Sequence, residues 1–347
     1  MTTHWTATAL AQLATSQWPQ APLISAADID EPIVPGHWLW DFWPAQLEDG
    51  SVAEVEGGAL WFALSAPHSV DPLERHRVAR IRLLHKGPGG WHDLGLAMPD
   101  GWSPGSREWS GSAVLRGREL TLWFTAAGRR GETTPSFEQR LFEAKARVEP
   151  GPRLEEWSPA TELVASDGTM YDLAQAATGS VGTIKAFRDP AWFRDPADGK
   201  AWLLFTGSAA GSRHTHNGVI GIAEQVGSAW RLLPPLVSAD GVNNELERPH
   251  LVVIGGRYHL FWSTQSSVFA PGVSAPTGLY GMVADQIKGP WRPLGGSGLL
   301  VANPVAAPDQ AYSWLVGSDG SISSFVDVLP DGTFGGIFAP ELSYFRL

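Results

Sequence analysis

The sequence predicts an all-β protein, a five-bladed β-propeller with a short N-terminal helix. The chain of 347 residues holds 39 Gly and 27 Pro but only 18% charged residues. That composition is typical of many short strands joined by tight turns. Two further observations favour the propeller: strand-like segments recur in the same order along the chain, and acidic motifs precede them at similar distances.

The repeat is built on apolar, aromatic segments that end in Ser, Thr or Ala. They cover residues 59–65, 120–125, 201–206 and 258–263. A second strand-like run follows, for example at 78–83 and 219–223, and then a turn and a predicted strand that carries Trp. The tryptophans are Trp91, Trp157, Trp230 and Trp291, and a fifth, partial copy covers residues 322–327 and 332–334.

The spacing of these copies indicates the architecture. The period is roughly 60–80 residues, longer than the about 40–50 of common propeller repeats. Five units of about four strands each predict a five-bladed propeller. A non-repeating β-sandwich with coincidental Trp spacing is the alternative.

The N-terminal region predicts a helix over residues 7–16, with Leu10 and Leu13 on one face. We expect residues 1–30 to be a helical or extended lead-in to a single domain over residues 1–347. No segment approaches the about 18 apolar residues of a membrane span. A basic region followed by an apolar run, the mark of a signal peptide, is also missing. We therefore expect a soluble protein that is cytoplasmic or secreted without a cleaved leader.

The charge and the reactive side chains exclude several function classes. A net charge of −11 argues against nucleic acid or an anionic membrane as a partner and is compatible with a neutral substrate. Without Cys there is no disulfide, thiolate metal site or Cys nucleophile. His214 and His216 are spaced to bind a metal but lie in a Gly- and Ser-rich stretch, so we expect no metal and no cofactor. Phosphate-loop and nucleophile-elbow motifs are absent.

Three acidic residues lie inside short, distinctive motifs. They are Asp41 in residues 40–44 (WDFWP), Asp189 in 188–190 (RDP) and Glu247 in 245–249 (ELERP). Each precedes the apolar segment of its repeat, and Ser110 holds the same place in the second copy and the pair Tyr312-Ser313 in the fifth. One polar residue per blade, at the start of the innermost strand, would point all five at the central channel. Two carboxyl groups flanking a sugar cleave glycosidic bonds, and a third would stabilise the cationic transition state.

The neighbours of each acid suggest its chemistry. Asp41 lies between Trp40 and Trp43, which suits a nucleophile, although an Asp that caps a turn is the simpler interpretation. Arg188 is expected to lower the pKa of Asp189 and keep it ionised, as a group that opposes positive charge must be. The second Arg-Asp-Pro copy, at residues 194–196, serves as an internal control and is interpreted as an ordinary turn.

The remaining candidates bind sugar or donate a proton. Glu245 and Glu247 share one face of a strand, so repulsion would raise one pKa of the pair, as a general acid requires. A charged edge strand is the alternative interpretation. We expect Trp40 and Trp109 to lie against a sugar ring.

Taken in order, the motifs resemble those of the levansucrase, inulosucrase and β-fructofuranosidase family, glycoside hydrolase family 68. The matching segments are residues 40–44, 108–112, 187–190, 245–249 and 303–304 with 312–313, so the resemblance covers nearly the whole chain. It implies a five-bladed propeller and a retaining double displacement on sucrose. Asp41 would be the nucleophile, Glu247 the general acid/base and Asp189 the transition-state stabiliser. The implied sugar-binding shell is Trp40, Trp109, Ser110, Arg188, Glu245, Arg248 and Tyr312.

The chain departs from this family at three points. Gln265 holds a position, just after the strand at 258–263, where many polymer-forming members carry Arg or His, so we add it to the substrate-binding residues. Asn244 replaces an Asp that binds structural calcium in some members, which argues against calcium dependence. The chain is also short, so loops that guide a growing polymer are expected to be trimmed.

We therefore expect a retaining β-fructofuranosidase that acts on sucrose and fructo-oligosaccharides. Fructose would pass mainly to water, with some fructo-oligosaccharide formed. A levansucrase-type transferase that makes levan is the alternative within the family. A non-catalytic sugar-binding propeller and a phosphorolytic or arabinan-cleaving propeller hydrolase are more remote alternatives.

Overall fold

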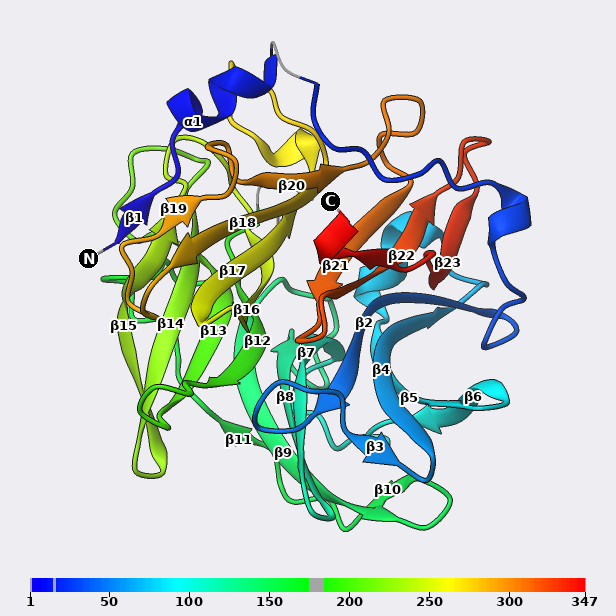
Figure 1. Cartoon of the computed structure of the whole chain (residues 1–347). Coiled ribbons are helices and arrows are strands. Elements are labelled where there is room, and N and C mark those ends of the chain that lie inside the picture. The colour runs from blue at the N-terminus through cyan, green and yellow to red at the C-terminus, as the bar shows by residue number, and fades with distance from the viewer. Residues whose placement is uncertain (1, 15–16, 175–183, 347) are drawn as a thin grey trace.

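The structure is a computed structural model that describes residues 2–14, 17–174 and 184–346. The described strands form four sheets. The largest sheet consists of two antiparallel sets, which are joined where β2 pairs in parallel with β7 through Ala45 and Gln46. Figure 1 shows the strand sets arranged around a common centre, with β2, β7, β12, β16 and β21 nearest to it.

The first set contains β2 (His37–Gln46), β3 (Glu54–Val55), β4 (Gly58–Pro67), β5 (Arg80–Gly87) and β6 (Gly90–Leu96). The second contains β7 (Arg107–Arg116), β8 (Glu119–Ala127), β9 (Gln139–Glu149), β10 (Arg153–Glu155) and β11 (Thr161–Glu162). The third contains β12 (Phe187–Arg194), β13 (Ala201–Ser208), β14 (Gly218–Val226) and β15 (Ala229–Ser238), with β1 (Thr3–His4) parallel to β15.

The fourth set contains β16 (Glu247–Ile254), β17 (Arg257–Thr264), β18 (Gly278–Ala284), β19 (Arg292–Pro293) and β20 (Leu299–Ala302). The last contains β21 (Ala311–Val316), β22 (Ser321–Val328), β23 (Phe334–Phe338) and β24 (Leu342–Ser343). Helical turns are short: α1 (Ala7–Ala11), η1 (Gln12–Ala14), η2 (Ala26–Asp28), η3 (Pro72–Arg77), η4 (Ser266–Val268) and η5 (Tyr344–Arg346). In the part of the chain that the structure describes, no helix is long and apolar enough to span a bilayer.

The repeated apolar segments are the second strands of their sets, β4, β8, β13 and β17. Their residues are buried almost without interruption, because the sets pack face to face and cover both sides of each second strand. The outer strand β6 is mostly exposed instead. The second strands are therefore continuous apolar runs because both of their faces are covered. The outer strands are rich in polar residues because they face solvent.

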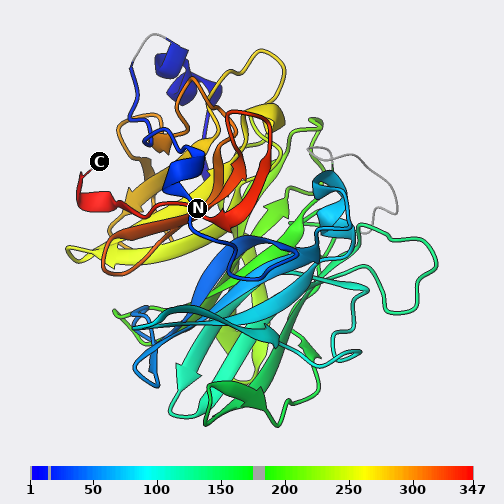
Figure 2. The same cartoon turned by 90° about the vertical axis from the view of Figure 1, so that its right-hand side faces the viewer.

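The N-terminal prediction is only partly correct. The helix expected over residues 7–16 is a five-residue α-helix, Ala7–Ala11, that continues as the 3₁₀ turn η1, and residues 15–16 lie outside the described residues. Tertiary contacts hold this lead-in: Trp5 packs on Trp262 and Tyr280 and donates its indole N–H to the Ser297 carbonyl at 2.8 Å. Figure 2, turned by 90°, shows these N-terminal segments lying along the sheets.

Two of the four tryptophans predicted on outer strands lie elsewhere. Trp91 and Trp230 lie on β6 and β15, but Trp157 follows β10 and Trp291 precedes β19. Both of the latter are at least nine-tenths buried. A Trp at this place in the repeat therefore indicates packing against a neighbouring sheet. A Trp in a loop can pack in the same way as a Trp in a strand.

A β-bulge interrupts every innermost strand of the described sets. The register with the second strand shifts at Trp40/Trp43, Trp109/Gly111, Arg188/Ala191, Glu247/His250 and Tyr312/Leu315. Asp41, Asp189, Arg248 and Ser313 take positive φ there, at 52°, 60°, 50° and 60°. A non-Gly residue seldom adopts this conformation, and such strain gathers at functional sites.

Candidate active site

A cavity of about 380 Å³ lies over these bulges. All eleven side chains predicted from the sequence line it: Trp40, Asp41, Trp109, Ser110, Arg188, Asp189, Glu245, Glu247, Arg248, Gln265 and Tyr312. They come from the innermost strands of different sets, from the loop before β16 and from the loop after β17. The fold thus gathers the motifs in one place, as the spacing of the repeat predicted.

The bulges correct the alignment of the repeats. Asp41, Ser110, Asp189, Arg248 and Ser313 are the equivalent residues, one in each innermost strand. Glu247 lies one residue earlier, at the position of Trp40, Trp109, Arg188 and Tyr312. Grouping Glu247 with the two aspartates was therefore wrong by one residue. The bulge presents two consecutive side chains per strand to the cavity, where a regular strand would present only one.

Two hydroxyl groups hold the aspartates. The Ser110 hydroxyl donates to Asp41 Oδ2 at 2.5 Å, and the Thr206 hydroxyl donates to Asp189 Oδ2 at 2.9 Å. The bond from Thr206 acts to lower the pKa of Asp189.

Hydroxyl residues also fix the bulge backbones, a role that the sequence reasoning missed. The N–H of Asp189 donates to Thr125 Oγ1 at 2.8 Å and the N–H of Arg248 to Thr206 Oγ1 at 3.1 Å. In each case the hydroxyl lies on the second strand of the preceding set. The sequence signal was present: Thr125 and Thr206 are the Ser/Thr residues with which the repeated apolar segments end. Their hydroxyl oxygens accept hydrogen bonds from the backbone N–H groups that the bulge leaves without a partner in the sheet.

Arg188 is the cation at the centre of the carboxylates. Its guanidinium lies 2.6 Å from Glu247 Oε1, 3.4 Å from Glu245 Oε2 and 3.5 Å from Asp189 Oδ2. These three anions raise the pKa of Arg188 above its ordinary value although burial opposes this. Tyr312 donates its hydroxyl to Glu247 Oε2, so both oxygens of Glu247 are held by protein donors.

Burial dominates the titration of the buried acids. It raises the pKa of Asp189 to about 6, with the charges of Glu247 and Asp41 adding to the effect and Arg188 opposing it. Arg188 lowers the pKa of Asp189 as expected, but the expected net lowering was wrong, because desolvation outweighs the adjacent cation. Burial, with Glu247 and Asp189, likewise raises the pKa of Glu245 to about 7. The carboxylates titrate as an interacting group.

Arg248 forms the floor of the cavity. Its guanidinium donates to Ser313 Oγ at 2.5 Å and to the Phe42 carbonyl at 2.9 Å, and it lies 5.7 Å from the ring centroid of Trp43. It thereby ties β16 to β21 and to the backbone beside Asp41. Its guanidinium donors therefore go to protein acceptors from two other strand sets.

The 3₁₀ turn η3 supplies a wall that the sequence reasoning also missed. The His76 carbonyl accepts the indole N–H of Trp109 at 3.0 Å, and the His76 ring packs edge-on to Trp40 at 5.5 Å. Arg75 lies 5.5 Å from the Trp40 ring centroid and pairs with Asp327 at 3.1 Å. Burial and nearby arginines hold the pKa of His76 well below its usual value. In sequence, the basic run at 75–77 resembles an ordinary solvated turn.

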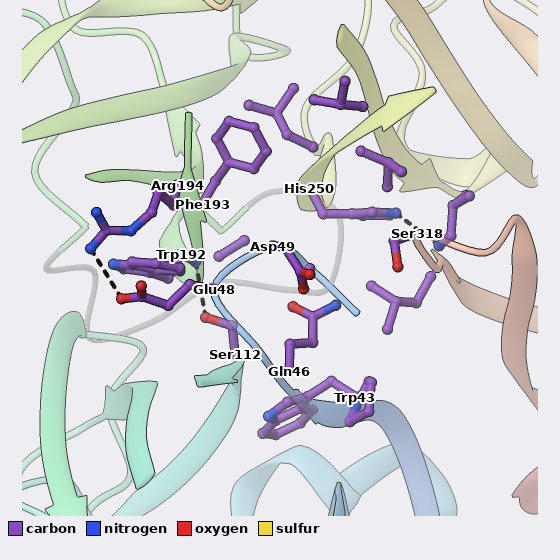
Figure 3. A pocket seen from close by; sticks show the side chains of 18 of the residues that line it. Trp43, Gln46, Glu48, Asp49, Ser112, Trp192, Phe193, Arg194, His250 and Ser318 are labelled. Carbon is purple, nitrogen blue, oxygen red and sulfur yellow. Dashed lines mark hydrogen bonds and ion pairs between the residues drawn. The ribbon is translucent and has the colours of Figure 1, made fainter. Parts of the chain in front are cut away.

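A second cavity, of about 240 Å³, lies beyond the floor (Figure 3). Asp189 and Arg248 line both cavities, and the other nine predicted residues do not line this one. Two of its charged groups, Arg194 and Glu48, pair with each other at 3.0 Å, a contact drawn in Figure 3. The predicted site residues therefore gather in the first cavity.

No group of three or more His, Cys, Asp or Glu side chains in the described ranges is placed to hold a metal ion. Asn244 is fully buried, and its side-chain oxygen accepts from the Lys185 ammonium at 3.3 Å. His214 is exposed.

Paired carboxyl groups beside a sugar-sized cavity are the groups with which glycoside hydrolases cleave glycosidic bonds. Residues 1–220 and 214–343 match the family model described as Levansucrase/Invertase. The chain therefore belongs to the levansucrase/invertase family, glycoside hydrolase family 68.

The relatives agree with this assignment. The chain is 32% identical to a levansucrase of Rahnella aquatilis, over 91% of this chain and 86% of that protein. It is similar to the solved structure of an inulosucrase from Halalkalicoccus jeotgali bound to kestose, with a TM-score of 0.88 and 35% identity over 98% and 92% of the two chains. A β-fructofuranosidase from Microbacterium saccharophilum K-1 gives a TM-score of 0.83 and 27% identity, over 99% and 80% of the chains.

Proposed function

We propose that this chain is a retaining β-fructofuranosidase that cleaves sucrose through a covalent fructosyl-enzyme. The observation that carries the proposal is the convergence of Asp41, Asp189 and Glu247 on one cavity, each held by a donor from a different strand. We interpret the strand sets as five blades of a single propeller domain over residues 1–347, and the cavity as the mouth of its central channel.

In the first step, Asp41 attacks the anomeric carbon of the fructosyl unit. The Ser110 hydroxyl holds Oδ2, so we assign the attack to Oδ1. A bond forms from Oδ1 to the anomeric carbon while the bond from that carbon to the glucose oxygen breaks. Glu247 gives its proton to the departing oxygen, and Asp189 opposes the positive charge that develops on the ring.

In the second step Glu247 acts as a base. It removes a proton from water, whose oxygen attacks the anomeric carbon and releases fructose and the Asp41 carboxylate. Arg188 and Tyr312 hold the two oxygens of Glu247 through both steps. Trp40 and Trp109, buried by the η3 turn, form the aromatic wall against which the sugar packs.

The fate of the fructosyl group depends on the acceptor side of the cavity. Gln265, at the start of η4, places a neutral amide at the cavity wall. A neutral amide binds a second sugar less strongly than a charged side chain would, because hydrogen bonds to charged groups are stronger. We therefore assign hydrolysis as the main reaction, with short fructo-oligosaccharides as minor products.

A levansucrase-type fructosyltransferase is the second candidate, favoured by relatives named levansucrase and inulosucrase. The two activities are separated by incubating the protein with sucrose and measuring free glucose and free fructose over time. Equal release supports the hydrolase. An excess of glucose shows that fructose passes to sugars, and it would replace the hydrolase with the transferase. Failure to cleave sucrose would refute both.

A further inference from the structure

Lys185 lies outside the machinery described so far and carries the most unusual set of contacts near it. Its half-buried ammonium lies 2.5 Å from the Thr215 carbonyl, 2.6 Å from Asn217 Oδ1 and 3.3 Å from Asn244 Oδ1. Three protein oxygens thus surround the Lys185 ammonium, two from residues 215–217 and one from residue 244. Such a set satisfies every N–H of an ammonium group.

The three segments belong to different parts of the fold. Lys185 lies just before β12, while Thr215 and Asn217 lie in the loop between β13 and β14. Asn244 belongs to the loop between β15 and β16, next to Glu245. The ammonium therefore joins the third strand set to the segment that leads into the fourth.

Asn244 connects Lys185 to the carboxylates of the cavity. Its side-chain amide donates to Glu245 Oε1 at 3.3 Å, while Glu245 Oε2 lies 3.4 Å from Arg188. Arg188 in turn holds Glu247 at 2.6 Å. A continuous line of polar contacts thus runs from Lys185 to the proposed acid/base.

Separate contacts fix the backbone and the carboxylate of Glu245. Asn243 is fully buried and accepts the Glu245 N–H at 2.7 Å, which fixes the backbone. The carboxylate is oriented by Asn244 on one side and by Arg188 on the other. Gly218 packs directly on the backbone of Asn244, so the loop cannot move toward β14.

We propose that Lys185 is a positioning residue for sugar binding, which acts through Asn244 to hold Glu245 in the cavity wall. The inference rests on the proposed function and on the sugar-binding role that the family resemblance implies for Glu245, which lines the cavity. The ammonium needs to be charged to hold three oxygens. Nearby Asp172, Glu245 and Asp240 favour that charge, although burial lowers the pKa of Lys185 overall.

The test compares Lys185→Met with Lys185→Arg and with Lys200→Met. Methionine keeps the length of the side chain but removes the charge and its donors, and arginine restores both. Lys200 is a control, because its ammonium also contacts more than one protein oxygen, from Asp198 at 3.1 Å and Glu224 at 3.6 Å, but lies on a turn that does not line the cavity.

Two readouts are needed. For Lys185→Met we expect KM for sucrose to rise about fivefold, the effect of losing about one net hydrogen bond, with kcat changed by less than about twofold. Lys185→Arg should recover most of the increase. Amide hydrogen exchange of residues 243–245 should become faster in Lys185→Met and stay unchanged in Lys200→Met.

An unchanged KM would overturn the proposal, even if exchange became faster, because Lys185 would then serve the loop structure alone. Unchanged exchange would overturn the anchoring itself. If the parent protein does not cleave sucrose, the proposed function fails, and exchange still decides whether Lys185 holds the segment. If Lys185→Met does not fold, Lys185→Gln, which is neutral but better tolerated at a polar site, takes its place with the same criteria.

Discussion

Replacing Asp189 with Asn should stabilise the protein while it destroys activity. Asp189 is 6% exposed, and burial raises its pKa from 3.8 to about 6. The folded state thus binds this proton more tightly than the unfolded chain does. The resulting stability is complete below pH 3.8 and is lost as the pH rises to about 6.

The shift of about two units corresponds to about 3 kcal/mol, at about 1.4 kcal/mol per unit. Asp189→Asn cannot titrate. Relative to the parent, its unfolding free energy should therefore increase by about 3 kcal/mol between pH 3.5 and pH 7.5. For a chain of 347 residues this equals a relative Tm increase of about 4 °C.

The assay follows thermal unfolding of both proteins by tryptophan fluorescence at the two pH values, with sucrose cleavage measured in parallel. Carboxylates that titrate alike in both proteins cancel in the comparison. We expect kcat to fall on the order of 10³-fold, since a group that opposes the developing charge is removed. A Tm difference that does not grow between pH 3.5 and pH 7.5 would refute the claim that burial outweighs Arg188.

The other predictions concern the remaining groups of the cavity. Asp41→Ala should abolish turnover with an unchanged circular dichroism spectrum, and Asp49→Ala, on the far side of the floor, should retain it; activity in Asp41→Ala would mean that the nucleophile is misassigned. Glu247→Gln should lose activity on sucrose but recover part of it on a fructoside with an activated leaving group, and a lack of recovery would contradict the acid/base role. Gln265→His should raise the ratio of transfer to hydrolysis, measured from free glucose and fructose. An unchanged ratio would contradict the proposal that the neutral amide of Gln265 weakens the binding of an acceptor sugar.

Sequence patterns predicted the second strands and the convergence of the motifs well. The apolar segments at 120–125 and 201–206 match β8 and β13, because strands covered on both faces need continuous apolar runs. The predicted helix at 7–16 was too long, because the lead-in is held by contacts such as Trp5 on Trp262, which local periodicity does not report.

The sequence by itself determined which residues meet. A repeat with one acidic or polar motif per copy brings Asp41, Asp189 and Glu247 together in any closed arrangement of equivalent strands. The Ser or Thr that ends each apolar segment was also readable, although the use of Thr125 and Thr206 in holding the bulge of the next set was not.

Only the tertiary structure decided how these residues behave. The register shift at each bulge makes Arg248, and not Glu247, the equivalent of Asp41, and no local pattern marks such a shift. The pKa of Asp189 is raised because distant strands bury it and place Glu247 and Asp41 nearby, which outweighs the adjacent Arg188. Desolvation and charge depend on everything packed around a group, so they follow from the assembled fold and not from the neighbours in the chain.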